Sequence, residues 1–354
     1  MNPVNYEKVP ILKMYRMARL IRRSQEILMD EYHPADEMRC PIHFCVGQES
    51  APAALASLLR EDDVVMSHHR SHGYYLAKGG SLEEMVAEFY GKESGCNGGL
   101  AGSQELSRAE SNFFSGTILS GMFAMASGSA FAQKYNETDG LTVAVIGDGG
   151  MEEGIVFETL NLAAVFNLPI IFICENNLYS AHTRIDKRSL SKNLLKRARA
   201  FDVGAELMDG NDPIILRNEF QKIFSEVRSK SRPFFVEIET YRLCGHVGPE
   251  NDDVLEYRSM TELQEWKKRD PVAYLRSVLL EMNATTQELE SLEDGIDAEV
   301  NMAINRAKQS PFPKIDAALA MNASNSFSPV VSSIRAGEGS DFDGNQNETK
   351  LAPY

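Results

Sequence analysis

The 354-residue sequence has none of the features that place a chain in a membrane or export it. Its longest apolar runs, such as LPIIFIC, are far shorter than the roughly 20 residues that a membrane-spanning helix needs. The N-terminal segment MNPVNYEKVP has neither the basic start nor the apolar middle of a signal peptide. We therefore expect a cytoplasmic protein with no membrane partner.

Cysteine and positive charge are also scarce. The five cysteines are an odd number without a CxxC pair, which favours reduced, mostly buried thiols over a disulfide framework or a zinc knuckle. The formal net charge is −15, and the basic residues form no stripe, so a nucleic acid backbone would be repelled. A few arginines and a metal ion can still bind one small anion inside a cleft.

Apolar patterns of two kinds alternate along the chain. LTVAVIGDGG and LPIIFICENN are typical of buried strands, and MEEGIVFETLNLAAVFN between them has helical spacing. This order predicts a βαβ unit and an α/β fold, with a parallel sheet covered by helices on both faces. Further predictions are a strand in PFFVEIETYR and a strand at 64–66, and helices over 11–32, 53–59, 116–134 and 259–282 and after an N-cap at Ser81.

Two features define the domain plan. Residues 116–134 are small and apolar almost throughout, so we expect that helix to be buried on most sides. Residues 1–310 are predicted to form the folded domain. Residues 311–354 are polar and rich in glycine and serine, which predicts a disordered or partner-dependent tail.

The turn after the first of the paired strands carries an acid among glycines. Asp148 lies there, and Asn177 follows the next strand, 29 positions later. The carboxyl ends of parallel strands lie at one edge of the sheet, and ligands bind at that edge. Neighbouring strands there are about 4.8 Å apart. An Asp and an Asn at this edge suit Mg²⁺, which usually keeps substrate phosphates in its shell, and Gly149 lets the backbone approach a diphosphate.

A dinucleotide site is the main alternative, because Gly147 and Gly149 follow a strand and Glu175 ends the next one. The third glycine of that motif is replaced by Glu152, and Glu153 adds a second acid where a pyrophosphate should bind. A simple tight turn, with Asp148 capping the helix, is the structural alternative. The paired ENN at 175–177 argues against it.

The stretch GDGGMEEGIVFETLNLAAVFNLPIIFICENN resembles the thiamine diphosphate motif, which begins GDG and ends NN about thirty residues later. A wider resemblance, which covers most of residues 10–300, is to the α subunits of 2-oxo acid dehydrogenases. The segments that carry this resemblance are FCVGQES, HRSHG, SLEEMVAEFYGK, NLAAVFNLPIIFICENN and ETYRLCGHVGP. The resemblance implies a thiamine diphosphate-binding fold, with thiamine diphosphate and Mg²⁺ as cofactors.

The resemblance also assigns metal and phosphate roles. Asp148, the side chain of Asn177 and the backbone carbonyl of Tyr179 would be the Mg²⁺ ligands, and Gly149 would touch the diphosphate. Zinc is not expected, although His68 and His72 are four apart, because the segment follows a strand and lacks the glutamate of HExxH.

Further cofactor contacts follow from the same resemblance. Arg70 and Arg242 would pair with diphosphate oxygens, for which a guanidinium offers two parallel donors. The backbone near Leu119 would hold the aminopyrimidine. His69 stands where the family commonly has a tyrosine, and this change touches the cofactor's phosphates.

His246 and His72 correspond to histidines at the mouth of the family's active site, and both are expected to be catalytic. Histidine exchanges protons near neutral pH, so they would stabilise the carboxylate of a 2-oxo acid or assist proton transfer. Glu153 lies where the family often has Glu or Gln near the cofactor. The roles of His246, His72 and Glu153 are expectations that follow from the resemblance.

The family needs a second chain. A glutamate that activates the aminopyrimidine comes from a separate β subunit, so the resemblance implies an α/β heterotetramer and a chain that is inactive alone. The default function is decarboxylation of a 2-oxo acid and transfer of the acyl unit to a lipoyl group on an acyltransferase. Alternatives are half of a carboligase that joins the same unit to an aldehyde or ketone, and a non-catalytic regulatory subunit.

Departures from the family pattern put the acceptor in doubt. The glycine-rich loop reads GGLAGSQEL, with Glu105 where the family has histidine, next to the expected substrate channel. After Arg242, Cys244 replaces a histidine and Val247 replaces the serine that is phosphorylated in mitochondrial members, which excludes that control. The altered loop favours the carboligase somewhat, while intact Asp148 and Asn177 argue against a regulatory subunit.

Overall fold

The computed structural model describes residues 8–35, 37–250 and 257–314. The described residues up to Pro311 form one compact unit by their contacts, and a second unit begins at Phe312. Of the second unit only 312–314 are described, and they are neither helix nor strand. The tail predicted for 311–354 therefore lies almost wholly outside the described residues.

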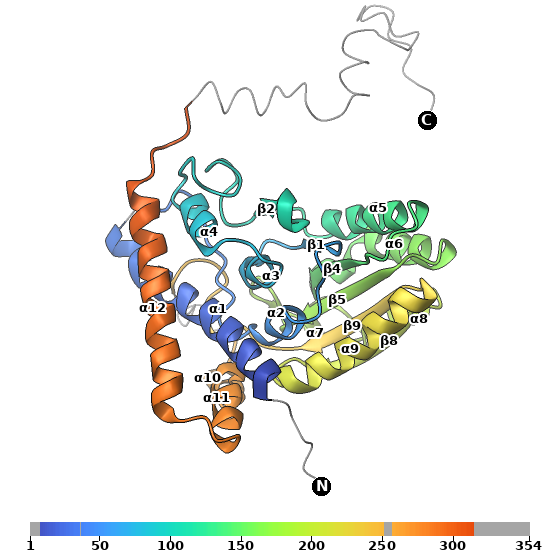
Figure 1. Cartoon of the computed structure of the whole chain (residues 1–354). Coiled ribbons are helices and arrows are strands. Elements are labelled where there is room, and N and C mark those ends of the chain that lie inside the picture. Colours follow the sequence, from blue (N-terminus) through green and yellow to red (C-terminus); the bar gives the residue numbers. More distant parts are fainter. Residues whose placement is uncertain (1–7, 36, 251–256, 315–354) are drawn as a thin grey trace, which may run out of the picture. The chain divides into compact units, whose positions relative to one another are not determined.

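A seven-stranded sheet is the centre of the first unit (Figure 1). Its strands run in the order β2-β3-β1-β4-β5-β9-β8, and every neighbouring pair is parallel except β2 with β3. A separate two-stranded hairpin joins β6 to β7. The strands are β1 (Val64–Ser67), β2 (Ser107–Arg108), β3 (Phe113–Ser115), β4 (Thr142–Gly147), β5 (Ile170–Asn176), β6 (Tyr179–Ser180), β7 (Thr183–Arg184), β8 (Gly204–Asp209) and β9 (Phe234–Glu239).

Helices cover both faces of this sheet, as Figure 1 shows for α5 and α6 on one side and α9 on the other. The helices are α1 (Lys8–Ala35), α2 (Ser50–Leu55), α3 (His72–Ala77), α4 (Leu82–Phe89), α5 (Gly121–Tyr135), α6 (Gly154–Val165), α7 (Ile185–Arg188), α8 (Leu195–Arg199), α9 (Pro213–Lys230), α10 (Met260–Lys267), α11 (Pro271–Glu281) and α12 (Thr286–Gln309). The predicted α/β class with a parallel, doubly covered sheet is confirmed.

The side chains of β4 explain why both faces are covered. Val143 and Val145 pack into a core with α1, α4 and α9, while Ala144 and Ile146 pack into a second core with α5 and α6. All four are buried, because successive side chains of a strand point to opposite faces. A strand apolar at every position therefore needs a helical layer on each side.

The helix predicted over 116–134 differs from α5 in two ways. It begins only at Gly121, after a turn in which Gly121 donates to the carbonyl of Ile118. It is buried on one side only, since Met125 and Tyr135 are 60% and 79% exposed. Its small residues reflect close packing on the sheet and do not extend around the helix.

Together with α6, the outer side of α5 presents an apolar face, formed by Met125, Phe131, Tyr135, Leu162, Val165 and Phe166.

Helix termini account for the other differences from the predicted boundaries. Ser81 caps α4 as predicted, since its Oγ accepts a hydrogen bond from the Glu84 amide at 3.3 Å. The stretch 259–282 is two helices, because Asp270 caps α11 and Pro271 occupies its first turn. The helix predicted over 53–59 is α2, which is shorter and starts at Ser50. Among the described helices, none is long and apolar enough to span a membrane.

Candidate functional site

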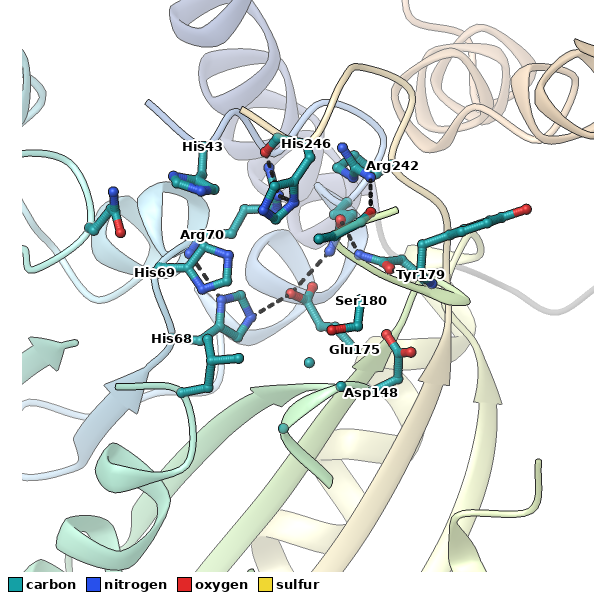
Figure 2. A pocket seen from close by; sticks show the side chains of 18 of the residues that line it. His43, His68, His69, Arg70, Asp148, Glu175, Tyr179, Ser180, Arg242 and His246 are labelled. Atoms are coloured by element: carbon teal, nitrogen blue, oxygen red, sulfur yellow. Dashed lines mark hydrogen bonds and ion pairs between the residues drawn. The ribbon is translucent and has the colours of Figure 1, made fainter. Parts of the chain in front are cut away.

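A cavity of about 330 Å³ lies at the carboxyl ends of β1, β4, β5 and β9, the edge where the sequence predicts a ligand (Figure 2). All of the predicted cofactor and metal residues except Glu153 line it. The lining residues are His43, Gln48, His68, His69, Arg70, Gln104, Thr117, Leu119, Gly147, Asp148, Gly149, Gly150, Glu175, Asn177, Tyr179, Ser180, Ala181, Arg242 and His246.

Asp148 lies in the turn that ends β4, and its side chain is almost fully buried. The neighbouring Gly149 is required sterically, because a Cβ there would lie 2.4 Å from the Ser180 Oγ. Arg188 of α7 binds both Asp148 and Glu152 through its guanidinium. Burial raises the pKa of Asp148, and the charge of Arg188 opposes that shift only in part.

Asn177 is held by hydrogen bonds at both ends of its amide. Its Oδ1 accepts from the backbone N–H of Tyr179 at 3.1 Å, and its Nδ2 donates to Gln48 Oε1 at 3.2 Å. Leu178 between them has a φ of +73°, which is a tight turn after β5. The local backbone therefore brings Asn177 and Tyr179 to the same cavity as Asp148.

Two buried guanidinium groups face this cavity. Arg70 is 5% exposed and donates to the carbonyls of Phe44 and His246, and no carboxylate of the described residues forms an ion pair with it. Burial, with the nearby charge of Arg242, lowers the pKa of Arg70 to about 10. Arg242 is 3% exposed and donates to Tyr257 Oη at 3.1 Å. The pair creates positive potential in a place shielded from water, which suits an anion.

A hydrogen-bonded chain along the wall of the cavity was not predicted. The Arg70 amide donates to His68 Nδ1 at 3.0 Å, so the His68 Nε2 carries the proton and donates to Glu175 Oε2 at 3.2 Å. Gln48 Nε2 donates to the same oxygen at 3.2 Å while Gln48 Oε1 accepts from Asn177. Gln48 lies in the segment FCVGQES and Glu175 in ENN, and both segments were noted in the sequence. The sequence does not show, however, that these two distant residues become hydrogen-bond partners in the fold.

Three imidazoles meet at one end of the cavity. The ring centroid of His43 lies 4.6 Å from that of His69 and 5.1 Å from that of His246. The ring centroids of His69 and His246 are 6.1 Å apart. Figure 2 shows them together, apart from Asp148. His43 was missed because it precedes α2 in a loop whose pattern carries no catalytic motif.

His72 does not lie where the sequence predicts. It begins α3, is fully buried against Phe89 with ring centroids 4.8 Å apart, and its Nδ1 hydrogen-bonds Gln25 Oε1 at 2.7 Å. Burial, with the charge of Arg70, lowers its pKa to about 3, so its ring is neutral near pH 7. It does not line the cavity, because α3 turns this side chain into the core, and its catalytic role stays a prediction.

Glu153 and Glu105 also lie outside the cavity lining. Glu153 is the exposed residue immediately before α6, beyond a short turn formed by residues 150–152. Glu105 is exposed and accepts a hydrogen bond from Thr117 Oγ1. It is the neighbouring Gln104 that lines the cavity, so the altered loop borders the site through a neutral amide.

The fold and the cavity define an α/β protein with a cavity at the edge of its parallel sheet that is lined by buried arginines and oxygen-bearing side chains. Residues 15–316 match the sequence model of the dehydrogenase E1 component, so the chain belongs to this family. Similar proteins include pyruvate dehydrogenase E1 component α subunits. One from Rickettsia bellii is 29% identical over 308 residues, covering 86% of this chain and 93% of the relative.

Eukaryotic relatives are similar over the same part of the chain. The mitochondrial α-1 subunit of Arabidopsis thaliana is 33% identical over 307 residues, covering 86% of this chain and 77% of the relative. The somatic mitochondrial form of Sus scrofa is 32% identical over 308 residues, with the same coverages. The chain is thus an α subunit of a thiamine diphosphate-dependent 2-oxo acid dehydrogenase, and the resemblance noted from the sequence is confirmed.

Proposed function

We propose that this α subunit binds thiamine diphosphate through Mg²⁺ in the cavity at the edge of the sheet. The observation that carries the proposal is the meeting of two buried arginines, Arg70 and Arg242, with Asp148 and Asn177 in one cavity. Buried cations persist in proteins only where anions or dipoles compensate them. A diphosphate would supply that compensation for Arg70, with which no carboxylate of the described residues forms an ion pair, and Gly149 leaves room for it beside the turn.

The oxygen ligands fit magnesium. Asp148, the side chain of Asn177 and the carbonyl of Tyr179 are hard oxygen donors of the kind that Mg²⁺ prefers. Arg188 occupies one oxygen of the Asp148 carboxylate. Asp148 would therefore hold the metal ion in competition with Arg188.

His246 is the residue that we assign to the reacting end. It lines the cavity, and its backbone carbonyl accepts a hydrogen bond from Arg70 at 2.9 Å, which fixes its loop beside the anion site. Thiamine diphosphate, when bound, would supply nucleophilic carbon chemistry toward the keto group of a 2-oxo acid. His246 would bind the carboxylate of that acid and hold or move a proton there.

A β subunit completes the enzyme in this family, and the 2-oxo acid is its substrate. We propose an α/β heterotetramer in which the β subunit supplies the activating glutamate. The apolar face of α5 and α6 supports a protein partner, because exposed Met125 and Phe131 gather there with four further apolar side chains. The acceptor that we propose is the lipoyl group of an acyltransferase, since the relatives favour a dehydrogenase over a carboligase. The cytoplasmic location stays a prediction.

Calorimetric titration of thiamine diphosphate and Mg²⁺ into the chain co-purified with its β subunit tests the proposal. We expect saturable, Mg²⁺-dependent binding, and a loss of affinity of roughly 100-fold or more in Asp148→Ala, because even outer-shell changes lose about 10–100-fold. Glu152→Ala is the control, since Glu152 shares Arg188 with Asp148 but does not line the cavity. Unchanged affinity in Asp148→Ala would refute the metal site.

Arg188 offers a second prediction at the same site. Because its guanidinium and Mg²⁺ compete for the Asp148 carboxylate, we expect Arg188→Met to bind Mg²⁺ about tenfold more tightly, a change of about 1.4 kcal/mol. Metal titration in the presence of saturating cofactor measures this directly. Weaker binding in the variant would instead show that Arg188 holds Asp148 in its binding position.

A further inference from the structure

Glu88, near the end of α4, carries a buried carboxylate that is held by backbone amides in place of a cation. The residue is 1% exposed, and no basic side chain of the described residues forms an ion pair with it. Its Oε2 accepts from the amides of Asn97 and Gly99 at 2.8 and 2.9 Å. Its Oε1 accepts from the amides of Ala101 and Gly102 at 2.8 and 3.0 Å. One carboxylate therefore ties together the whole turn to which these four residues belong.

The backbone of this turn adopts a conformation that glycine allows. Gly99 and Gly102 have φ angles of +76° and +71°. Neighbouring N–H groups that point to one side in such a turn form a concave site for an anion, and here the anion is the chain's own carboxylate. A Cβ on Gly99 would lie 2.5 Å from the carbonyl carbon of Gly91, and a Cβ on Gly95 would lie 2.3 Å from Glu88 Oε2. The segment thus leaves room for the carboxylate and for no side chain at these two positions.

The turn leads directly to the cavity. The next residue, Ser103, donates its amide to Cys40 Sγ at 3.2 Å and its hydroxyl to the carbonyl of Pro41 at 2.8 Å. Gln104 follows, with its carbonyl accepting from Ser115 Oγ at 3.4 Å, and it lines the cavity. The side-chain amide of Gln104 has no hydrogen-bond partner within the part of the chain that the structure describes, so it is available to a ligand in the cavity.

A turn this rich in glycine needs a tie to stay in one conformation. Glycine loses more conformational freedom on folding than any other residue, and a buried carboxylate is unfavourable unless its hydrogen bonds are complete. Two oxygens that each accept two amides meet both requirements at once. The position of the turn is therefore set by Glu88 before any ligand binds.

We propose that Glu88 is a positioning residue of this enzyme. Its carboxylate fixes the turn at 97–102, so that the side-chain amide of Gln104 is held in the cavity and hydrogen-bonds the 2-oxo acid there. The inference rests on the proposed function, since that acid is the substrate of the same cavity. Glu88 does not line the cavity and acts through Gln104. Because the turn is ordered in advance, binding of the acid loses less conformational entropy.

Glu88→Gln tests the tie without changing the size of the side chain. Glutamine has one oxygen, so one pair of amides loses its acceptor and faces an NH₂ group. In the complex with the β subunit, we expect hydrogen exchange over 97–102 to become at least about tenfold faster, because a lost hydrogen bond lowers local protection. Unchanged protection of α4 separates this effect from a loss of the fold. Glu84→Gln is the matched control, because the Glu84 side chain lies one turn earlier in α4 and binds Arg108 at 2.8 Å.

Kinetics of the assembled enzyme test the link to the substrate. Carbon dioxide release is measured with pyruvate, 2-oxobutanoate or 3-methyl-2-oxobutanoate, whichever the parent enzyme converts fastest, and an artificial two-electron acceptor completes turnover. We expect Gln104→Ala to raise KM for that acid about tenfold, with a smaller effect on kcat, because it removes a binding contact. Glu88→Gln should raise KM by a similar factor. The double variant should have the KM of Gln104→Ala alone, since both changes remove the same interaction.

Each contrary result has its own meaning. Unchanged exchange over 97–102 in Glu88→Gln would overturn the tie. Increases in KM that multiply in the double variant would show that Glu88 acts elsewhere, and an unchanged KM in Gln104→Ala would overturn the contact with the substrate. If the parent enzyme released carbon dioxide from none of the three acids, the proposed function itself would be wrong and the substrate contact would fall with it. The exchange experiment would still decide whether Glu88 fixes the turn.

Discussion

Replacing Arg70 with glutamine is expected to weaken thiamine diphosphate binding by about 100-fold and to leave the cofactor-free protein at least as stable as before. Arg70 is buried among carbonyl groups and lies close to Arg242, and these surroundings disfavour its charge. Without the anion, that charge destabilises the fold. With the anion bound, it contributes a charge-assisted contact, and truncating one partner of such a contact costs about 2–5 kcal/mol.

Two quantities are measured, the cofactor affinity and the stability without cofactor, and Arg70→Gln is expected to lower the first without lowering the second. Titration calorimetry with saturating Mg²⁺ gives the cofactor affinity, and the unfolding midpoint without cofactor gives the stability. Arg199→Gln is a matched control, because Arg199 also donates to a backbone carbonyl, that of Ala205, but does not line the cavity. A fall in both quantities for Arg70→Gln would mean that Arg70 is a structural residue and not an anion ligand.

The sequence predicted the sheet and the cavity edge better than it predicted individual side chains. Runs such as LTVAVIGD specify a strand that is buried on both faces, and β4 and β5 lie side by side as expected. Asp148 and Asn177 each lie in the turn directly after one of these strands, so their positions are determined mainly by where the strands end. Spacing along the chain was therefore sufficient to bring them to one cavity.

Side chains whose direction depends on packing were predicted less well. His72 is only two residues from Arg70, but it begins α3, and the packing of α3 against α1 buries its ring. His43 shows the converse, since only the fold brings its loop against the ends of β1 and β9. The exposed side of α5 escaped prediction because small apolar residues allow close packing without showing how many sides of the helix are covered.

Glu49→Ala is expected to lower the free energy of unfolding by about 3–5 kcal/mol, because it leaves Arg22 buried with too little compensating charge. The Glu49 side chain is fully buried, and its two oxygens accept from Arg22 at 2.6 and 3.0 Å. Glu49 also accepts from the amide of Gly47, which has a φ of +97° and precedes Gln48 of the cavity. Asp270, 2.7 Å from Arg22, offsets part of the loss.

A neighbouring pair separates the effect of burial from that of geometry. Arg23 and Asp297 make the same two-bond contact, at 2.8 and 2.8 Å, but their side chains are 23% and 37% exposed. Water already solvates both charges there, so Asp297→Ala should cost only about 0–1 kcal/mol. Urea unfolding of each variant, followed by the fluorescence of Trp266, the single tryptophan, measures the difference. Equal destabilisation would show that the contact geometry sets the stability. A larger loss in Glu49→Ala assigns the stability to the burial of Glu49.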